Sequence, residues 1–228
     1  MLIKKLIQNF LIPILILIAV IGIPILVISL CVTHPEVKGR YIFTVFVFIV
    51  LIERVWETFY STEEKRRHKL YGDWTLVLTT VLYLIMAAIA ISEFFLIKRE
   101  KNIIISVIAG IIFILAFLVR IWGIKKLGRQ WAVHAVGASK VKKAELRLIK
   151  EGPYKYIRHP IYLATIFEVI SLPLIVNCYY ACLFALFINS PMYIVRAYSE
   201  ERLSIRKFGQ EYIKYKEEVP GFFPRIFR

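Results

Sequence analysis

Long apolar stretches dominate the chain and limit the folds it can adopt. The segment from Leu6 to Cys31 contains no charged residue, whereas about 20 apolar residues suffice for a helix to cross the hydrocarbon core of a membrane. A signal peptide has a shorter apolar core and a small-residue cleavage site, so we interpret this stretch as a retained helix. Pro13, Gly22 and Pro24 are positions where this helix is expected to bend.

Five further apolar stretches predict an all-α polytopic membrane protein with about six transmembrane helices. Hydrophobic residues make up 59% of the chain of 228 residues, far more than in a soluble domain of this size. Only Asn177 and Cys178 separate the last two stretches, which are short. We therefore expect a tight hairpin, and five full crossings also fit the pattern. The five stretches cover approximately Tyr41–Tyr60, Trp74–Ile97, Ile103–Trp122, Ile161–Val176 and Tyr179–Val195.

The distribution of basic residues predicts how the chain is oriented. The connector from Gly123 to His159 contains ten Lys and Arg residues, and the tail from Arg196 to Arg228 contains eight. Cytoplasmic loops are enriched in these residues, so the connector and both termini are expected on the cytoplasmic side. The formal net charge of +15 fits a basic inner face beside anionic lipid, and we expect no nucleic-acid partner.

Cysteine and histidine residues give no indication of a metal site. The three cysteines are Cys31, Cys178 and Cys182, and the four histidines are scattered along the chain. Neither set has the spacing of zinc ligands or of a paired redox motif. No metal cofactor is therefore expected.

The chain divides near residue 123 into two regions with different character. Residues 1–122 are predicted to form a transmembrane region of four helices, and residues 123–228 contain the connector, the hairpin and a cytoplasmic tail. Polar and aromatic residues concentrate between Gly152 and Tyr162, just before the hairpin. A proline that starts a helix does not need Arg158 and His159 as neighbours, so this segment indicates a site. The alternative is that both side chains anchor the helix at the lipid headgroups.

A second polar group follows the hairpin. Arg196 and Glu200 are four residues apart and so share one face of a helix, with Glu201 beside them. An antiparallel hairpin brings this group back to His159, whereas a solvated helix end is the alternative interpretation. Glu168 lies two turns into the hairpin and should face protein or a polar pocket, because a charge at the bilayer centre costs about 2.5 to 3.5 kcal/mol. Glu93 is expected to reach the outer surface.

The order and spacing of these residues resemble the isoprenylcysteine carboxyl methyltransferase family of integral membrane enzymes. The resemblance covers about residues 125–224. Two positions depart from the family pattern: Ala164 stands where glycine is usual, and Cys178 replaces the proline of the hairpin bend. The residues that carry the resemblance are Gly152, Pro153, Tyr154, Arg158, His159, Pro160, Tyr162, Glu200, Glu201, Phe208, Gly209, Tyr212, Tyr215, Val219, Pro220 and Pro224.

The resemblance implies an S-adenosylmethionine site on the cytoplasmic side, built from the connector and the inner ends of the hairpin. Its implied cofactor-binding residues are Leu148, Ile149, Tyr154, His159, Pro160, Tyr162 and Glu200. The first two match a segment that runs along the cofactor, and Glu200 matches a carboxylate that holds it. Arg196 matches a position that faces the substrate. The implied substrate is a lipophilic or prenylated molecule that arrives from the membrane lipid.

The acceptor of the methyl group stays open at this point. Methyl transfer to an anionic carboxylate needs positioning and no general base. For a thiol or an amine, His159 or Glu201 is the tentative proton acceptor. A phospholipid or small amine or thiol methyltransferase is therefore the alternative enzyme, since such enzymes share a related Arg-His-Pro hairpin. A transporter or scaffold would carry polar residues at mid-membrane in several helices, and only Glu168 qualifies clearly.

Overall fold

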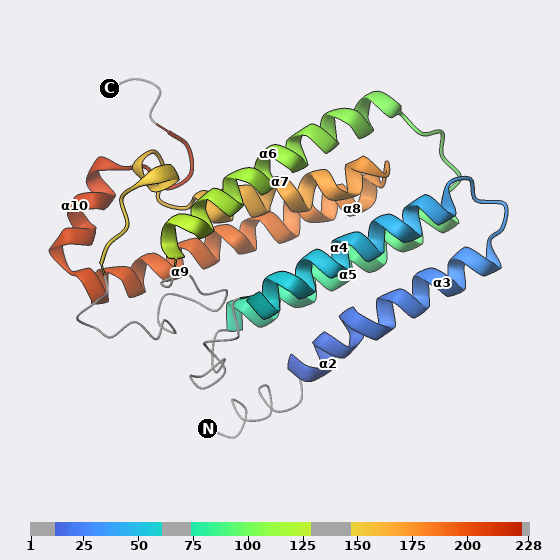
Figure 1. Ribbon diagram of the computed structural model, residues 1–228, viewed down its shortest axis with the longest axis horizontal. Coiled ribbons are helices and arrows are strands. Elements are labelled where there is room, and N and C mark those ends of the chain that lie inside the picture. Colours follow the sequence, from blue (N-terminus) through green and yellow to red (C-terminus); the bar gives the residue numbers. More distant parts are fainter. Residues whose placement is uncertain (1–11, 61–73, 129–146, 225–228) are drawn as a thin grey trace.

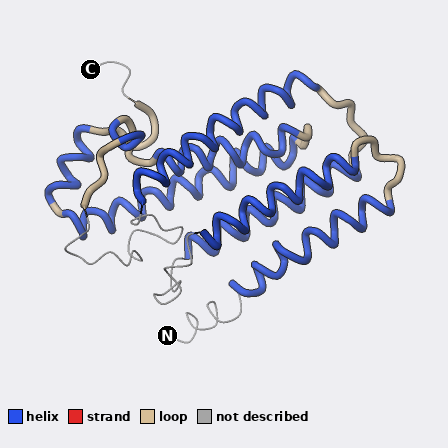
Figure 2. The backbone as a smooth tube through the Cα atoms, in the orientation of Figure 1, coloured by secondary structure: helices blue, strands red, loops and turns tan. Residues whose placement is uncertain are grey.

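The computed structural model describes residues 12–60, 74–128 and 147–224. Within these ranges the regular elements are all helical, and the tube in Figure 2 contains no strand. The prediction of an all-α chain is confirmed for this part. The predicted basic connector lies partly outside the described residues, since 129–146 are among those left out.

Six helical rods account for most of the described chain, and they follow the six apolar stretches of the sequence. A short 3-10 helix, η5, precedes the hairpin, and α10 follows it. In chain order the elements are α2 (Ile12–Leu17), the π-helical turn η2 (Ile18–Gly22), α3 (Ile23–Thr33), α4 (Arg40–Tyr60), α5 (Trp74–Leu96), α6 (Ile103–Leu127), η5 (Gly152–Lys155), α7 (Pro160–Ile175), α8 (Tyr179–Phe184), the π-helical turn η6 (Ala185–Asn189), α9 (Ser190–Phe208) and α10 (Gln210–Glu218).

The first rod is continuous but changes its winding in the middle. Pro24 lies in the first turn of α3, directly after the π-helical turn η2. Proline has no backbone N–H and therefore cannot continue the regular α-helical hydrogen bonds. The predicted irregularity at Gly22 and Pro24 thus takes the form of a π-helical turn inside the rod.

The rods lie side by side in one elongated bundle (Figure 1). Helix α6 packs along α7, and α7 in turn contacts α8 and α9. Helix α5 joins this group to the N-terminal rods, because it contacts α8, η6 and α9 as well as α3. Helix α10 lies at the end of the bundle where α6 and α9 end and α7 begins (Figure 1). The candidate site residues belong to this end.

Three described helices are long and apolar enough to cross a membrane: Val77–Leu96, Ile103–Leu127 and Tyr179–Phe208. Shorter apolar helices cover Ile18–Thr33, Arg40–Ile52 and Pro160–Ile175. Large apolar side chains on α4 and α6 are exposed, which suits contact with lipid acyl chains. These features identify a membrane protein, while the number of full crossings and the orientation stay predictions.

The second helix of the hairpin is longer than its apolar stretch. It continues past Val195 and reaches Phe208 as a run of 30 residues, about 45 Å at 1.5 Å per residue. No proline or glycine interrupts the chain between Ser199 and Gly209, where φ is +56°. Since about 30 Å is enough to cross the hydrocarbon, this helix is longer than one crossing requires, and Glu200 and Glu201 lie on its polar end.

Buried ion pairs neutralise the carboxylates inside the bundle. The prediction that Glu168 faces protein is confirmed, because its side chain is fully buried and pairs with Arg120 Nε of α6 at 2.8 Å. Glu93 differs from the expectation that it reaches the surface. It is buried, pairs with Arg99 at 2.6 Å and accepts a hydrogen bond from the Ala181 backbone N–H at 3.1 Å. A nearby cation and a free backbone donor thus replace water as its partners.

Asn177 forms the predicted tight turn of the hairpin. Its φ of +62° is a backbone conformation that asparagine tolerates better than most residues. The side-chain oxygen accepts the backbone N–H of Asn102 at 2.9 Å, and the side-chain nitrogen donates to Ser106 Oγ at 2.7 Å. These bonds fix the tip of the hairpin to the start of α6.

Candidate functional site

Two glycines allow the segment before the hairpin to pack against the end of α6. Gly152 has a φ of +61°, and a Cβ atom there would meet Lys126 Cγ at 2.7 Å. A Cβ atom at Gly123 would meet Ile161 Cγ1 at 2.9 Å and Tyr154 Oη at 3.5 Å. Only glycine fits such close approaches without a shift of its neighbours. Tyr154 is thereby buried between η5 and α6.

The Arg-His-Pro segment forms the start of α7. Pro160 occupies the first turn, where its missing N–H leaves no partner unsatisfied. The backbone N–H groups of Arg158 and His159 donate to the carbonyls of Pro220 and Gly221 at 2.9 and 3.0 Å. His159 is buried. The turn is therefore tied to a segment more than 50 residues later in the chain.

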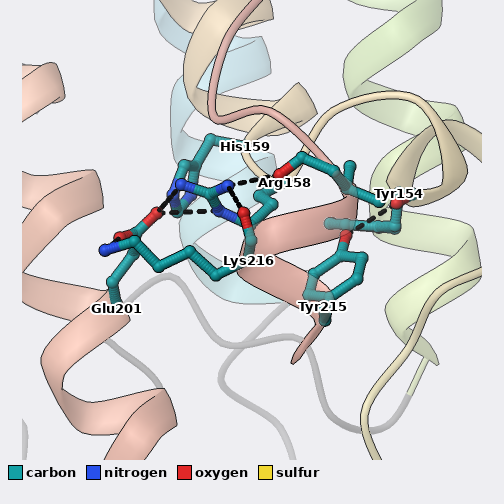
Figure 3. A network of polar contacts seen from close by, with 7 residues as sticks. Tyr154, Arg158, His159, Glu201, Tyr215 and Lys216 are labelled. Atoms are coloured by element: carbon teal, nitrogen blue, oxygen red, sulfur yellow. Dashed lines mark hydrogen bonds and ion pairs between the residues drawn. The ribbon is translucent and has the colours of Figure 1, made fainter. Parts of the chain in front are cut away.

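Glu201 is the centre of a buried network (Figure 3). Its Oε1 accepts hydrogen bonds from Arg158 Nε at 2.9 Å, Arg158 Nη2 at 2.7 Å and His159 Nε2 at 2.9 Å. Its Oε2 pairs with Lys216 Nζ at 2.7 Å. The Glu201 side chain is only 3% exposed. Both oxygens are thus engaged within the protein, and two cations hold the group as a carboxylate.

A second chain of polar contacts links Arg196 to Glu200. The Tyr162 hydroxyl donates to Glu200 Oε1, and Arg196 Nε donates to that hydroxyl at 3.1 Å. Arg196 Nη1 also donates to Thr79 Oγ1 of α5 at 3.4 Å. Arg196 is buried, whereas Glu200 is partly buried. Three helices, α5, α7 and α9, therefore contribute to one polar chain at this end of the bundle.

The tyrosines around the network are neutral hydrogen-bonding groups. Burial raises the pKa of Tyr154, and the nearby charge of Glu200 raises it further. Burial likewise raises the pKa of Tyr215, and that of Tyr212 to about 12. The Tyr215 hydroxyl can therefore donate at neutral pH, and it does so to the Tyr154 carbonyl at 2.6 Å (Figure 3).

The structure brings most of the predicted site residues together. Tyr162, Glu200 and Arg196 form one chain, and His159 joins Glu201 in the other. Leu148 and Ile149 are partly buried in the loop before η5. Their part in a cofactor site stays a prediction, as do the roles of the other residues.

Sequence reasoning missed three residues of this region: Thr79, Lys216 and Phe222. Thr79 is buried in α5, and a polar residue within an apolar helix was the available signal. Lys216 resembles any surface lysine in the sequence, and Phe222 resembles a tail aromatic. Among the described residues, no group of three or more His, Cys, Asp or Glu side chains is placed to hold a metal ion.

Comparisons with known proteins agree with the resemblance seen in the sequence. Residues 108–206 match the model of the isoprenylcysteine carboxyl methyltransferase (ICMT) family. The matched region starts inside α6 and ends before α10, so it contains Arg158, His159, Tyr162, Arg196, Glu200 and Glu201 but neither Thr79 nor Lys216. A protein of Bacillus subtilis, the uncharacterized protein YpbQ, is 26% identical over 168 residues, which are 70% of this chain and 95% of that protein.

Proposed function

We propose that the chain transfers a methyl group from S-adenosylmethionine to a lipophilic acceptor, because its residues 108–206 match the model of the isoprenylcysteine carboxyl methyltransferase family of membrane methyltransferases. The acceptor is a carboxylate of the isoprenylcysteine type, and it reaches the site from the membrane. The site lies on the cytoplasmic side with both chain termini, as the basic residues predict. Residues 123–228 carry the chemistry, and residues 1–122 support it.

The observation that carries this proposal is the polar chain from Arg196 through Tyr162 to Glu200. It joins the residue assigned to the substrate with two residues assigned to the cofactor. His159, another assigned residue, lies next to this chain, because its ring centroid is 6.1 Å from that of Tyr162. A methyltransferase needs its two ligands side by side, and this arrangement provides adjacent positions for both.

The residues present fit S-adenosylmethionine. Glu200 is partly buried, and its carboxyl oxygens can accept hydrogen bonds from the hydroxyl or ammonium groups of the cofactor. The rings of Tyr154 and Tyr162 offer aromatic faces to a sulfonium cation. When bound, the cofactor supplies an electrophilic methyl group. The protein's part is to hold that group in line with the acceptor, and such positioning is worth about 7 to 11 kcal/mol in well-oriented reactions.

Arg196 orients the acceptor in this mechanism. Its guanidinium presents a planar fork of donors that matches the two oxygens of a carboxylate. An ionised carboxylate attacks the methyl group directly, so no proton has to be removed. The contacts of the tentative proton acceptors support the same choice of acceptor, since both oxygens of Glu201 and Nε2 of His159 are engaged within the protein. We therefore assign Glu201 the role of holding the Arg-His-Pro turn.

Binding of S-adenosylhomocysteine to the purified protein tests the class of function first. Titration calorimetry in detergent should give a dissociation constant in the micromolar range. Methylation of a lipophilic carboxylate then distinguishes the proposed reaction from methylation of an amine or a phospholipid. A protein that shows no binding would be a transporter or a scaffold instead.

Replacing Glu200 by Gln is expected to weaken S-adenosylhomocysteine binding about tenfold or more, because the side chain keeps its size but loses its charge. The thermal unfolding temperature should change little, since Glu200 is only partly buried. Calorimetry of the variant measures the affinity. The matched control is Glu217→Gln, which removes an exposed carboxylate of α10 and should bind like the parent protein. Equal affinity of the two variants would remove Glu200 from the cofactor site.

Replacing Arg196 by Lys separates substrate handling from cofactor binding. The charge remains but the fork is lost, so methylation of a lipophilic carboxylate should fall at least about tenfold, which is about 1.4 kcal/mol. Affinity for S-adenosylhomocysteine should stay within about threefold. Arg206→Lys on the exposed side of α9 is the control. A parallel loss of binding and turnover would instead make Arg196 a structural partner of Glu200.

A further inference from the structure

The last described residues fold back over the candidate site. Helix α10 and the segment Val219–Pro224 together are named the C-terminal clamp here. The carbonyls of Pro220 and Gly221 accept the backbone N–H groups of Arg158 and His159 at 2.9 and 3.0 Å. These two donors precede Pro160 and lie outside the α-helical hydrogen bonds of α7. The clamp thus supplies the partners of the Arg-His-Pro turn.

Side chains of α10 hold two further segments of the site. Tyr215 is buried and donates to the Tyr154 carbonyl at 2.6 Å. Lys216 Nζ pairs with Glu201 at 2.7 Å, and the Lys216 carbonyl accepts a hydrogen bond from Arg158 Nη1 at 3.0 Å. At the protein surface, Glu211 Oε1 of α10 pairs with Lys150 Nζ at 3.1 Å, and Lys150 follows Ile149 in the chain. Every segment assigned to the cofactor therefore has a contact with α10 or lies next to one.

Phe222 is the aromatic residue of the clamp that contacts His159. The two ring centroids are 5.4 Å apart, with an angle of 35° between the ring planes. Tyr162 lies against the same imidazole at 6.1 Å, and Tyr198 of α9 lies against Phe222 at 6.4 Å. With Glu201 bonded to Nε2 at 2.9 Å, the imidazole is held at its edge and by two aromatic neighbours. Such ring pairs favour defined mutual orientations.

The next residue along the chain behaves differently. Phe223 is 73% exposed, whereas Phe222 is partly buried. The chain therefore offers two neighbouring phenylalanines, of which one contacts the site and the other faces outward. A role that depends on contact with His159 should therefore need Phe222 and not Phe223. A general preference of aromatic residues for the membrane interface would apply to both.

From these contacts we propose that Phe222 is a positioning residue for methyl-donor binding, because it fixes the His159 ring while the C-terminal clamp holds the segments around it. The inference rests on the proposed function and extends it to residues beyond the matched region 108–206. Phe222 acts through His159 and does not react itself. Helix α9 carries Glu200 and Glu201, and the C-terminal clamp packs against the Arg-His-Pro turn beside them.

The test compares Phe222→Leu with Phe223→Leu in the full-length protein. Leucine keeps an apolar side chain but removes the ring, so the affinity of Phe222→Leu for S-adenosylhomocysteine should fall about fivefold, the scale of one aromatic pair. Phe223→Leu should bind within about twofold of the parent, and Phe222→Tyr, which keeps the ring, should do the same. Thermal unfolding of each variant shows whether it is folded. Parent-like binding by Phe222→Leu, or an equal loss in Phe223→Leu, overturns the proposal.

A second measurement does not depend on the methyl donor. Proteins labelled with ¹³C at histidine give ring signals for each of the four histidines, and a His159→Gln variant assigns the signal of His159. Loss of the ring current in Phe222→Leu should move this signal, and Phe223→Leu should leave it in place. If the parent protein fails to bind S-adenosylhomocysteine, the proposed function fails, yet this signal still decides whether Phe222 positions His159. An unmoved signal in Phe222→Leu overturns the inference in either case.

Discussion

Replacing Glu201 by Gln is expected to lower the free energy of unfolding by about 3 kcal/mol, the low end of the range for breaking a buried ion pair. The side chain is 3% exposed, and its partner Arg158 is 7% exposed. Removing the charge leaves the Arg158 guanidinium buried without its counter-ion. Unfolding in mixed micelles, followed by circular dichroism, measures the change. The Arg-His-Pro turn should loosen as well, so binding of S-adenosylhomocysteine should fall with stability.

Lys216→Met is the matched control for Glu201. It removes a partner of the same carboxylate, but one whose side chain is 45% exposed. An ion pair with so much contact with water contributes about 0 to 1 kcal/mol. The expected loss in free energy of unfolding is therefore below about 1 kcal/mol. A loss in Lys216→Met as large as that in Glu201→Gln would mean that burial does not set the contribution of each partner.

Replacing Arg120 by Met should also destabilise the fold by about 3 kcal/mol or more, since it removes the cation that pairs with a fully buried carboxylate. Glu168 is fully buried and Arg120 Nε lies 2.8 Å from it. The pair joins α6 to α7, and the Arg120 guanidinium also lies 5.4 Å from the centroid of the Phe117 ring. Unfolding in mixed micelles again measures the effect.

The double variant Arg120→Met with Glu168→Met tests whether the stability lost in Arg120→Met comes from the charge left behind on Glu168. Apolar residues of similar volume often replace a buried ion pair at no net loss. The double variant should therefore recover most of the stability that Arg120→Met loses. Glu168→Met is measured alone as well. If the free energy of unfolding lost in the double variant equals the sum of the losses in Arg120→Met and Glu168→Met, the two groups are not coupled.

Two adjacent carboxylates serve different purposes because they lie on one helix. Successive residues of an α-helix point about 100° apart around its axis. Glu200 therefore faces Tyr162, while Glu201 faces Arg158 and His159. Glu200 stays partly exposed and can contact a ligand. Glu201 is buried, and its oxygens bind residues that hold the site together. A sequence motif of two glutamates does not distinguish these functions.

The amino-acid sequence by itself determined the class of the protein and the region of the site. An apolar run can be recognised from neighbouring residues alone, so the sequence predicted the six helical rods and the turn at Asn177 and Cys178 between the last two. The order of the Arg-His-Pro segment and the later glutamates indicated a resemblance to the isoprenylcysteine carboxyl methyltransferase family, whose model matches residues 108–206. These residues also include most members of the two polar chains. The same local information placed Glu168 against protein, because a buried charge needs a partner wherever the helix lies.

Only the tertiary structure decided which groups are partners. These partners lie far apart in the sequence. Arg120 is the counter-ion of Glu168, and Thr79 is a neighbour of Arg196. The carbonyls of the C-terminal clamp accept the backbone N–H groups of Arg158 and His159. Backbone carbonyls carry no sequence signal, and a lysine such as Lys216 looks the same whether or not it faces a buried carboxylate. The helix from Tyr179 to Phe208 is also longer than its apolar stretch, because the apolar pattern ends near Val195 while residues that favour a helix continue to Phe208. Hydrophobic patterning thus fixes where helices form, whereas side-chain and backbone pairing depends on how they pack together.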